Sequence, residues 1–271
     1  GGGSVSARFG WYTASIGASP QTVLDCLHAA FEVSDVKPST PHNGYERAYS
    51  VVRGGTVLAR VQFGGSSVGA RVWANASGEQ APAFAQVIRE NFNGHRLLRA
   101  DVAIDYDEEG AWDSLSTLAI QTADAYRLKV QHVGDFHREK DGRTINIGSR
   151  SSAAYQRTYE KGKQLGQSPN WVRQELELKP KSENAKVLYG LVSPQEMYQA
   201  TKWTQHIWKT LNGPTTALRP APPGSVRTIS DDDRALEFMG KQYGNVLRRK
   251  LEALGGDLEA FGAYIACLVS D

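Results

Sequence analysis

Acidic and basic side chains alternate with apolar ones in residues 99–105, Arg-Ala-Asp-Val-Ala-Ile-Asp. Successive side chains of a β-strand point to opposite faces, so Arg99, Asp101 and Asp105 share one face of the predicted strand. The opposite face is apolar. Carboxylates on a polar face could bind a cation.

Two later segments show the same alternation. In residues 171–178 the polar face carries an arginine and two glutamates, and in residues 154–161 one face carries two tyrosines, an arginine and a lysine. If these strands share a sheet with helices on the apolar face, their polar side chains meet on the other face. This set is Asp101, Asp105, Tyr155, Arg157, Tyr159, Lys161, Arg173, Glu175 and Glu177.

Gathered carboxylates repel one another unless a cation lies between them, and oxygen ligands suit Mg²⁺ or Mn²⁺. Such an ion would polarise a phosphodiester, and nearby Arg and Lys would stabilise the developing charge. A tyrosine hydroxyl has an ordinary pKa near 10 and becomes nucleophilic where cations favour the phenolate. These residue types therefore suit covalent phosphotyrosine chemistry.

Each element of this pattern also has an ordinary structural interpretation. Alternating charge is common on the solvated face of an antiparallel sheet, and tyrosines are common in strands. The segment Gly148-Ser149-Arg150-Ser151-Ser152 is either a plain turn or a phosphate contact made by amides, hydroxyls and an arginine.

Charge is unevenly distributed along the chain. Residues 127–181 contain twelve Lys or Arg and six Asp or Glu, a net charge of +6, whereas the rest of the chain carries −4. This excess is typical of a phosphate-binding surface or of a solvated charged face. The six histidines lack metal-ligand spacing, and no Gly-Lys-Ser/Thr loop indicates ATP use.

The order of strand-like and helix-like segments predicts an α+β fold, with a central, mostly antiparallel sheet, helices on one face and the active site on the other. No internal repeat is evident in the sequence. We expect a catalytic domain at residues 5–211, a proline-rich linker at 212–229 and a small helical unit at 230–271. Cys26 and Cys267 lie in apolar helical patterns and are predicted to be reduced core residues.

No apolar run is long enough to span a membrane and no signal peptide is recognisable, so a cytoplasmic protein without membrane contact is expected. The opening Gly-Gly-Gly-Ser resembles a cloning scar and is left out of the fold prediction.

Four motifs occur in order over about 80 residues: Arg-Ala-Asp-Val-Ala-Ile-Asp (99–105), Ile-Gly-Ser-Arg-Ser-Ser (147–152), Arg-Thr-Tyr-Glu-Lys-Gly (157–162) and Trp-Val-Arg-Gln-Glu-Leu-Glu-Leu-Lys (171–179). Together they resemble the Rep_trans family of replication initiation factors, which includes rolling-circle initiators of plasmids and filamentous phages and relaxases of some integrative elements.

The resemblance implies a Mg²⁺- or Mn²⁺-dependent endonuclease and strand transferase. Such an enzyme nicks one strand at a replication origin, leaves a 5′-phosphotyrosine and a free 3′-hydroxyl, and later reseals the strand. It implies Tyr159 as nucleophile with Arg157 and Lys161 beside it, and Arg173 as a clamp on the phosphate. The implied metal ligands are Asp101, Asp105 and Glu175, and Glu177 could replace or assist Glu175. Tyr155 lies on the same face as Tyr159 and is a further candidate site residue. Arg143, Ser149, Arg150, Ser151 and Lys163 are the expected DNA contacts.

The expected partners are origin DNA with an extruded single strand, a host polymerase and a host helicase, because an initiator without an ATP site must borrow one. Whether the chain forms a homodimer stays open. Three other readings remain: a non-catalytic origin-binding regulator of the same fold, a relaxase of an integrative element, and a metal-dependent phosphodiesterase that acts through water.

Overall fold

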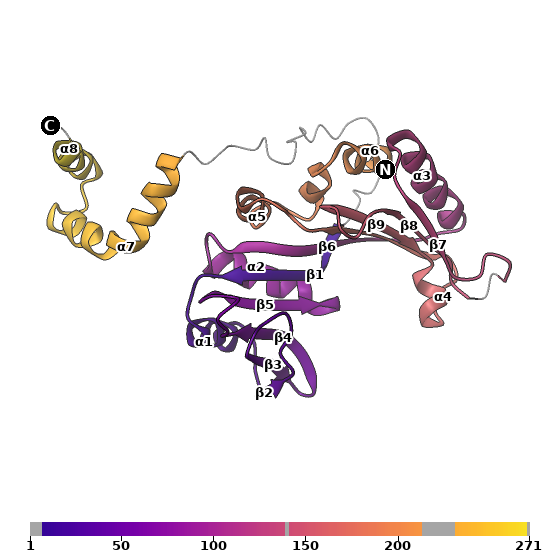
Figure 1. Cartoon of the computed structure of the whole chain (residues 1–271), viewed down its shortest axis with the longest axis horizontal. Coiled ribbons are helices and arrows are strands. Elements are labelled where there is room, and N and C mark those ends of the chain that lie inside the picture. The colour runs from indigo at the N-terminus through magenta and orange to yellow at the C-terminus, as the bar shows by residue number, and fades with distance from the viewer. Residues whose placement is uncertain (1–6, 139–140, 213–230, 270–271) are drawn as a thin grey trace. The chain divides into compact units, whose positions relative to one another are not determined.

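The computed structural model describes residues 7–138, 141–212 and 231–269 (Figure 1). The chain divides into two units, residues 1–226 and 227–271. The predicted linker at 212–229 lies outside the described residues except for Asn212, which ends a helix. None of the described helices is long and apolar enough to cross a membrane.

The first unit contains a ten-stranded sheet in which every described strand pairing is antiparallel, in the order β2-β3-β4-β5-β1-β6-β10-β9-β8-β7. The predicted α+β class is therefore confirmed. The strands are β1 (Ala7–Ile16), β2 (Asp35–Ser39), β3 (Arg47–Arg53), β4 (Thr56–Phe63), β5 (Val72–Ser77), β6 (Arg96–Asp107), β7 (Val130–Val133), β8 (Thr144–Gly148), β9 (Ala154–Tyr159) and β10 (Trp171–Leu178).

Three helices, α2, α3 and α5, pack on the apolar face of this sheet. The helix α2 contacts β1 and β5, α5 contacts β6, and α3 contacts β8, β9 and β10. The helices of the first unit are α1 (Pro20–Ala30), α2 (Ala81–Asn91), α3 (Ala111–Tyr126), α4 (Lys161–Leu165), α5 (Glu183–Tyr189) and α6 (Lys202–Asn212), with short 3-10 helices at Gly78–Gln80 and Gln195–Gln199.

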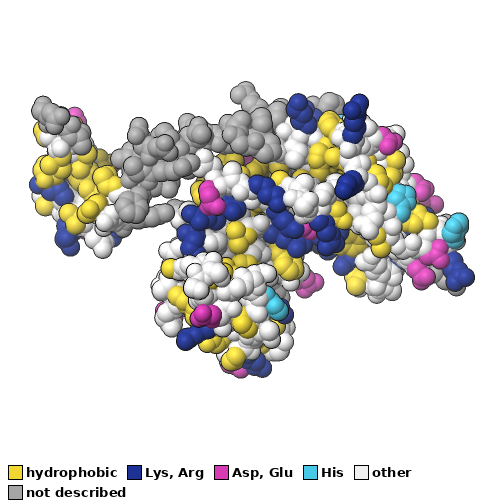
Figure 2. Space-filling view, viewed as in Figure 1, with side chains coloured by type: hydrophobic (Ala, Val, Ile, Leu, Met, Phe, Trp, Pro, Cys, Tyr) yellow, Lys and Arg dark blue, Asp and Glu magenta, His cyan; other side chains and the backbone are white. Residues whose placement is uncertain are grey.

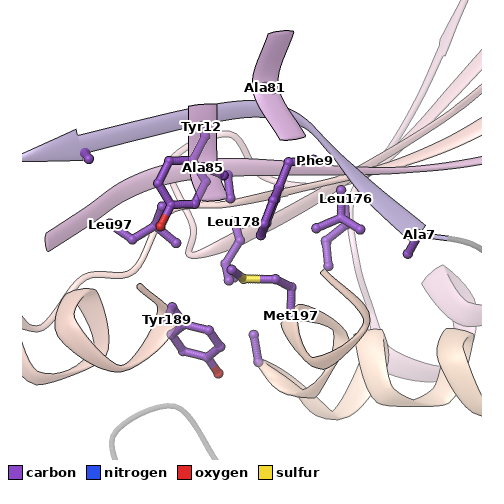
Figure 3. Close-up of a cluster of buried hydrophobic side chains, with 14 of the residues drawn as sticks. Ala7, Phe9, Tyr12, Ala81, Ala85, Leu97, Leu176, Leu178, Tyr189 and Met197 are labelled. Atoms are coloured by element: carbon purple, nitrogen blue, oxygen red, sulfur yellow. The ribbon is translucent and has the colours of Figure 1, made fainter. Parts of the chain in front are cut away.

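The apolar core lies between the sheet and these helices. Figure 3 shows Phe9 and Tyr12 of β1 packed near Leu178 of β10 and Met197 of the second 3-10 helix. The even-numbered apolar residues of β6 also enter this core, because alternation along the strand sends them to the helix side. The opposite face keeps the polar side chains.

Local sequence signals account for several boundaries. Ser19 caps α1 by accepting a hydrogen bond from the Thr22 amide, and Pro20 follows at the first helical position. Gly54 and Gly55 both have positive φ, 53° and 86°, as the tight hairpin between β3 and β4 requires. Glu196 and Ser193 form a capping box, and the chain then makes a 3-10 turn before α6 begins.

The order of elements repeats, which the sequence had not indicated. The series β1-α1-β2-β3-β4-β5-α2 is followed by β6-α3-β7-β8-β9-β10-α5, with α4 inserted between β9 and β10. Strand order from the centre of the sheet outward is also the same in both halves, and β1 pairs with β6 at the centre. The sheet therefore consists of two halves related by an approximate two-fold axis.

The second unit consists of α7 (Asp231–Ala253) and α8 (Leu258–Val269), which pack together. Asp257 caps α8 by accepting hydrogen bonds from the amides of Glu259 and Ala260. The prediction for the cysteines is wrong for Cys267, which is exposed in α8, whereas Cys26 is half-buried.

Candidate functional site

The polar face of β6, β10 and β9 brings together most of the predicted site residues, because strand register aligns them in rows. Tyr159 of β9 lies opposite Arg173 of β10, which lies opposite Asp105 of β6. In the next row Glu175 lies between Arg157 and Ala103. The third row contains Tyr155, Glu177 and Asp101.

Tyr159 is the tyrosine of this face that contacts a carboxylate. Its hydroxyl donates a hydrogen bond to Glu175 Oε2 at 3.3 Å, and the Nζ of Lys161 lies 5.8 Å from the centre of its ring. A hollow of about 230 Å³ opens beside it, lined by Thr144, Arg157, Tyr159, Gln164 and Glu175. The phenol is therefore next to both a proton acceptor and a free space.

The electrostatic setting of Tyr159 differs from the one predicted. Burial, followed by the negative charge of Glu175, raises the pKa of Tyr159 to about 12, and Arg173 offsets only part of this rise. The phenol is thus held protonated at neutral pH. A nucleophilic role requires a base that removes its proton, and Glu175 is the carboxylate in contact.

Arg157 lies at the centre of the acidic residues. Its Nη2 contacts Asp101 Oδ2 at 3.1 Å, hydrogen-bonds Glu175 Oε1, and lies 3.7 Å from Glu177 Oε2. Glu177 also pairs with Lys179 at 2.8 Å. The carboxylates therefore surround a guanidinium group.

Arg99 adds a second guanidinium to this cluster. It binds Asp101 through two hydrogen bonds, of 2.9 and 2.8 Å. Burial, the largest effect, raises the pKa of Asp101, and Arg99 lowers it only in part. Sequence alternation placed Arg99 on this face but gave no sign of the bidentate contact.

Asp105 belongs to a separate ion pair. It accepts two hydrogen bonds from Arg173, at 2.7 and 3.0 Å, one from the Trp171 indole at 2.9 Å and one from Arg8 at 2.6 Å. Burial would raise the pKa of Asp105, but these donors outweigh it and lower the pKa to about 2. Arg8 comes from the distant strand β1, so the sequence offered no signal for it.

The three predicted metal ligands do not meet at one point. Asp101 and Asp105 are four residues apart on β6, a backbone separation of roughly 13 Å. Within the ranges that the structure describes, no three His, Cys, Asp or Glu side chains are grouped so that they could hold a metal ion. As arranged, Asp101, Asp105 and Glu175 bind arginines and do not fit a shared three-carboxylate metal centre.

The predicted DNA contacts occupy different places. Arg143 and Lys163 both bind the buried Glu160, through Arg143 Nη2 at 2.9 Å and Lys163 Nζ at 2.8 Å. They line a hollow of about 610 Å³ that also contains Trp112 and Asn170. Burial raises the pKa of Glu160, but the hydrogen bonds from Arg143 and Lys163 outweigh it and lower the pKa to about 2.

The predicted phosphate-contact turn lies after β8. Ser149 is half-buried and Ser151 is exposed, and the two hydroxyls hydrogen-bond each other at 2.8 Å. Arg150 lies 5.4 Å from the ring centre of Tyr155. Tyr155 is buried, with 4% of its surface exposed. Figure 2 shows Lys and Arg side chains gathered near the middle of the first unit.

One predicted strand end was wrong. Residues 154–161 were expected to form one strand, with Lys161 continuing the alternation. β9 instead ends at Tyr159, and Lys161 begins α4, because the backbone leaves the extended conformation at Glu160. Lys161 therefore approaches Tyr159 from a helix.

These strands also carry the sequence similarity. Residues 96–218 match the replication initiation factor family. The resemblance inferred from the four motifs is thereby confirmed over this segment, which begins at the first residue of β6 and is less than half of the chain. No curated protein matches the sequence.

The fold is similar to that of a known initiator. The structure of a rolling circle replication initiator protein from Geobacillus stearothermophilus superposes with a TM-score of 0.56 at 14% sequence identity. The match covers 77% of this chain and 97% of that one, so it includes most of the ten-stranded unit. At this identity the similarity establishes a shared fold.

Proposed function

We propose that this chain initiates rolling-circle DNA replication by nicking one strand at an origin, with Tyr159 as nucleophile. The proposal rests on one observation above the others: the hydroxyl of Tyr159 faces the Glu175 carboxylate beside an open hollow, within a cluster of arginines. The family match over residues 96–218 supports the same general role.

The chemical step uses groups of this chain. Glu175 accepts the phenol proton as Tyr159 Oη attacks a backbone phosphorus, and the bond from phosphorus to the 3′ oxygen breaks. The leaving 3′ oxygen takes a proton from water. The product is a 5′-phosphotyrosine, which retains the energy of the broken bond and permits rejoining by the reverse reaction.

Arginines hold the phosphate during this step. Arg173 lies opposite Tyr159 in the strand register, and Arg157 lines the same hollow as the phenol. Their guanidinium groups can form paired hydrogen bonds to the non-bridging phosphate oxygens and stabilise the charge that develops there. Lys161 contributes a further positive charge near the ring.

Metal dependence stays a prediction from the sequence. The carboxylates of this face bind arginines in the described conformation, so no step of the proposed reaction is routed through a metal ion. The released 3′-hydroxyl suits a host polymerase as a primer, and unwinding requires a host helicase because no nucleotide-binding loop is present in the sequence.

A plasmid assay tests this function. Supercoiled DNA that carries the region flanking the coding gene is incubated with the protein and Mg²⁺ or Mn²⁺, and open circles are resolved on a gel. We expect open circles with the wild-type chain and none with Tyr159→Phe. Undiminished nicking by Tyr159→Phe would contradict the proposal.

A second candidate is a non-catalytic origin-binding regulator. It is favoured by the ion pairing of the acidic residues and by the raised pKa of Tyr159, since both describe a stable polar face with a protonated phenol. This candidate predicts origin affinity without nicking under any metal condition.

A further inference from the structure

The two halves of the sheet correspond residue by residue when β1 is aligned with β6, β5 with β10 and β4 with β9 at the midpoints of the strands. Asn75 of β5 lies between Thr13 of β1 and Arg60 of β4. In the second half, Glu175 of β10 lies between Ala103 of β6 and Arg157 of β9. Asn75 thus takes the position of Glu175, and Arg60 takes the position of Arg157.

The adjoining row shows the same correspondence. Trp73 lies between Ser15 and Gln62, whereas Arg173 lies between Asp105 and Tyr159. Gln62 therefore stands where the second half has its tyrosine, and Ser15 stands where it has a carboxylate. The first half lacks both the nucleophile and the acidic residues at these positions.

The absence of acidic residues changes the charge on this face of the first half. Arg157 is surrounded by three carboxylates, whereas its counterpart Arg60 is exposed beside the neutral Asn75. No ion pair within the described ranges includes Arg60. Its positive charge is not balanced by a neighbouring carboxylate and can attract a phosphate.

A hollow of about 280 Å³ lies at this position, lined by Arg60, Asn75, Trp11 and Ser77 among others. The indole of Trp11 is fixed by a 2.7 Å hydrogen bond to Thr13 and by the Arg99 guanidinium, 4.5 Å from its ring centre. A cation, neutral polar groups and an aromatic ring together are typical of single-stranded nucleic-acid sites.

We propose that this hollow is a second, non-cleaving subsite, in which Arg60 binds a phosphate of the same single DNA strand that is held at Tyr159. The proposal rests on the proposed function. β4 and β9 are five strand positions apart in one continuous sheet, roughly 24 Å along its surface. A strand within the usual site size of about 4–16 nucleotides can reach both places.

Fluorescence anisotropy with a labelled single strand of about 16 nucleotides tests the subsite. We expect Arg60→Ala to weaken binding about three- to tenfold and to reduce the salt slope by about 0.7, the value for one lost phosphate contact on a single strand. Asn75→Asp, which places a carboxylate opposite Arg60, should weaken binding in the same direction.

Arg47→Ala is the matched control, because Arg47 is also an exposed arginine. It lies on β3 three residues before Ser50, the register partner of Arg60, so its side chain points to the opposite face of the sheet. Its affinity should equal that of the wild type. Equal affinities for Arg60→Ala and Arg47→Ala would overturn the subsite.

A second measurement separates the subsite from the reaction. At saturating DNA, Arg60→Ala should form as much covalent protein–DNA adduct as the wild type, because Arg60 only binds the strand. Reduced adduct at saturation would overturn the non-cleaving role. If the wild type bound no single strand, the proposed function itself would fail, whereas selective loss of affinity in Arg60→Ala supports both.

Discussion

The hydroxyl of Tyr159 donates a hydrogen bond to Glu175 Oε2 over 3.3 Å. Through its other oxygen the same carboxylate accepts a hydrogen bond from Arg157. Glu175 therefore connects the proposed nucleophile to the cationic cluster.

Glu175→Gln removes the proposed proton acceptor but keeps the size of the side chain. We expect its nicking rate at pH 7 to fall about 10²–10⁴-fold. Burial, the largest cause of the raised pKa of Tyr159, remains in the variant, so without a base the reactive phenolate becomes more abundant as pH rises. The rate of the variant should rise roughly tenfold per pH unit between pH 7 and 9.

The nicking rate of the wild type should change little between pH 7 and 9. Glu177→Gln serves as control, because Glu177 lies one row away and does not hydrogen-bond Tyr159. Its pH profile should keep the wild-type shape. Parallel profiles for Glu175→Gln and the wild type would argue against a base at this position.

Arg157→Gln tests whether the positive charge of Arg157 neutralises the acidic residues around it. With its central guanidinium removed, Asp101, Glu175 and Glu177 lose their shared partner and repel one another. We expect the variant to bind Mn²⁺ at least about tenfold more tightly than the wild type in isothermal titration calorimetry. Arg173→Gln, which exposes one carboxylate, should show no such gain.

Tight Mn²⁺ binding by the wild type itself would contradict this prediction and would point to the carboxylates as metal ligands. Tight Mn²⁺ binding by the wild type that Asp101→Asn abolishes would show that a metal displaces Arg157, as the sequence-based metal prediction requires.

Glu160→Gln tests the ion pairs behind the active face. The pKa of Glu160 is lowered to about 2, so its ionised form stabilises the fold above the ordinary glutamate pKa, and this stability is lost as pH falls toward 2. We expect the variant to lose about 2 kcal/mol of unfolding free energy at pH 7, measured by urea denaturation.

That difference should shrink between pH 4 and pH 2 as the wild-type carboxylate takes up its proton. Glu109→Gln, a change at an exposed carboxylate, should leave the unfolding free energy unchanged at every pH. A constant difference for Glu160→Gln down to pH 2 would be inconsistent with the lowered pKa.

Alternation predicted the active face well because it depends only on strand geometry. The strand Trp171–Leu178 was predicted with its observed ends. Register was not predictable, since it depends on pairing between distant strands. Hence the contact of Arg157 with Asp101, and that of Arg8 with Asp105, could not be foreseen.

The sequence also did not predict the two edge strands of the sheet or its two-fold arrangement. β2 (Asp35–Ser39) contains a proline and charged residues, and β7 (Val130–Val133) is short and exposed, so neither shows the alternation of an inner strand. The repeat is invisible in the sequence because corresponding positions, such as Gln62 and Tyr159, differ in chemistry. Only the pairing pattern relates them.

A covalent adduct assay tests the central claim most directly. An origin single strand labelled at its 3′ end is incubated with the protein and resolved on a denaturing gel, since the label stays with the 5′-phosphotyrosine product. We predict a slow-migrating labelled protein band for the wild type and for Tyr155→Phe, and none for Tyr159→Phe. A band that persists in Tyr159→Phe, or that is absent from the wild type, would contradict the proposed mechanism.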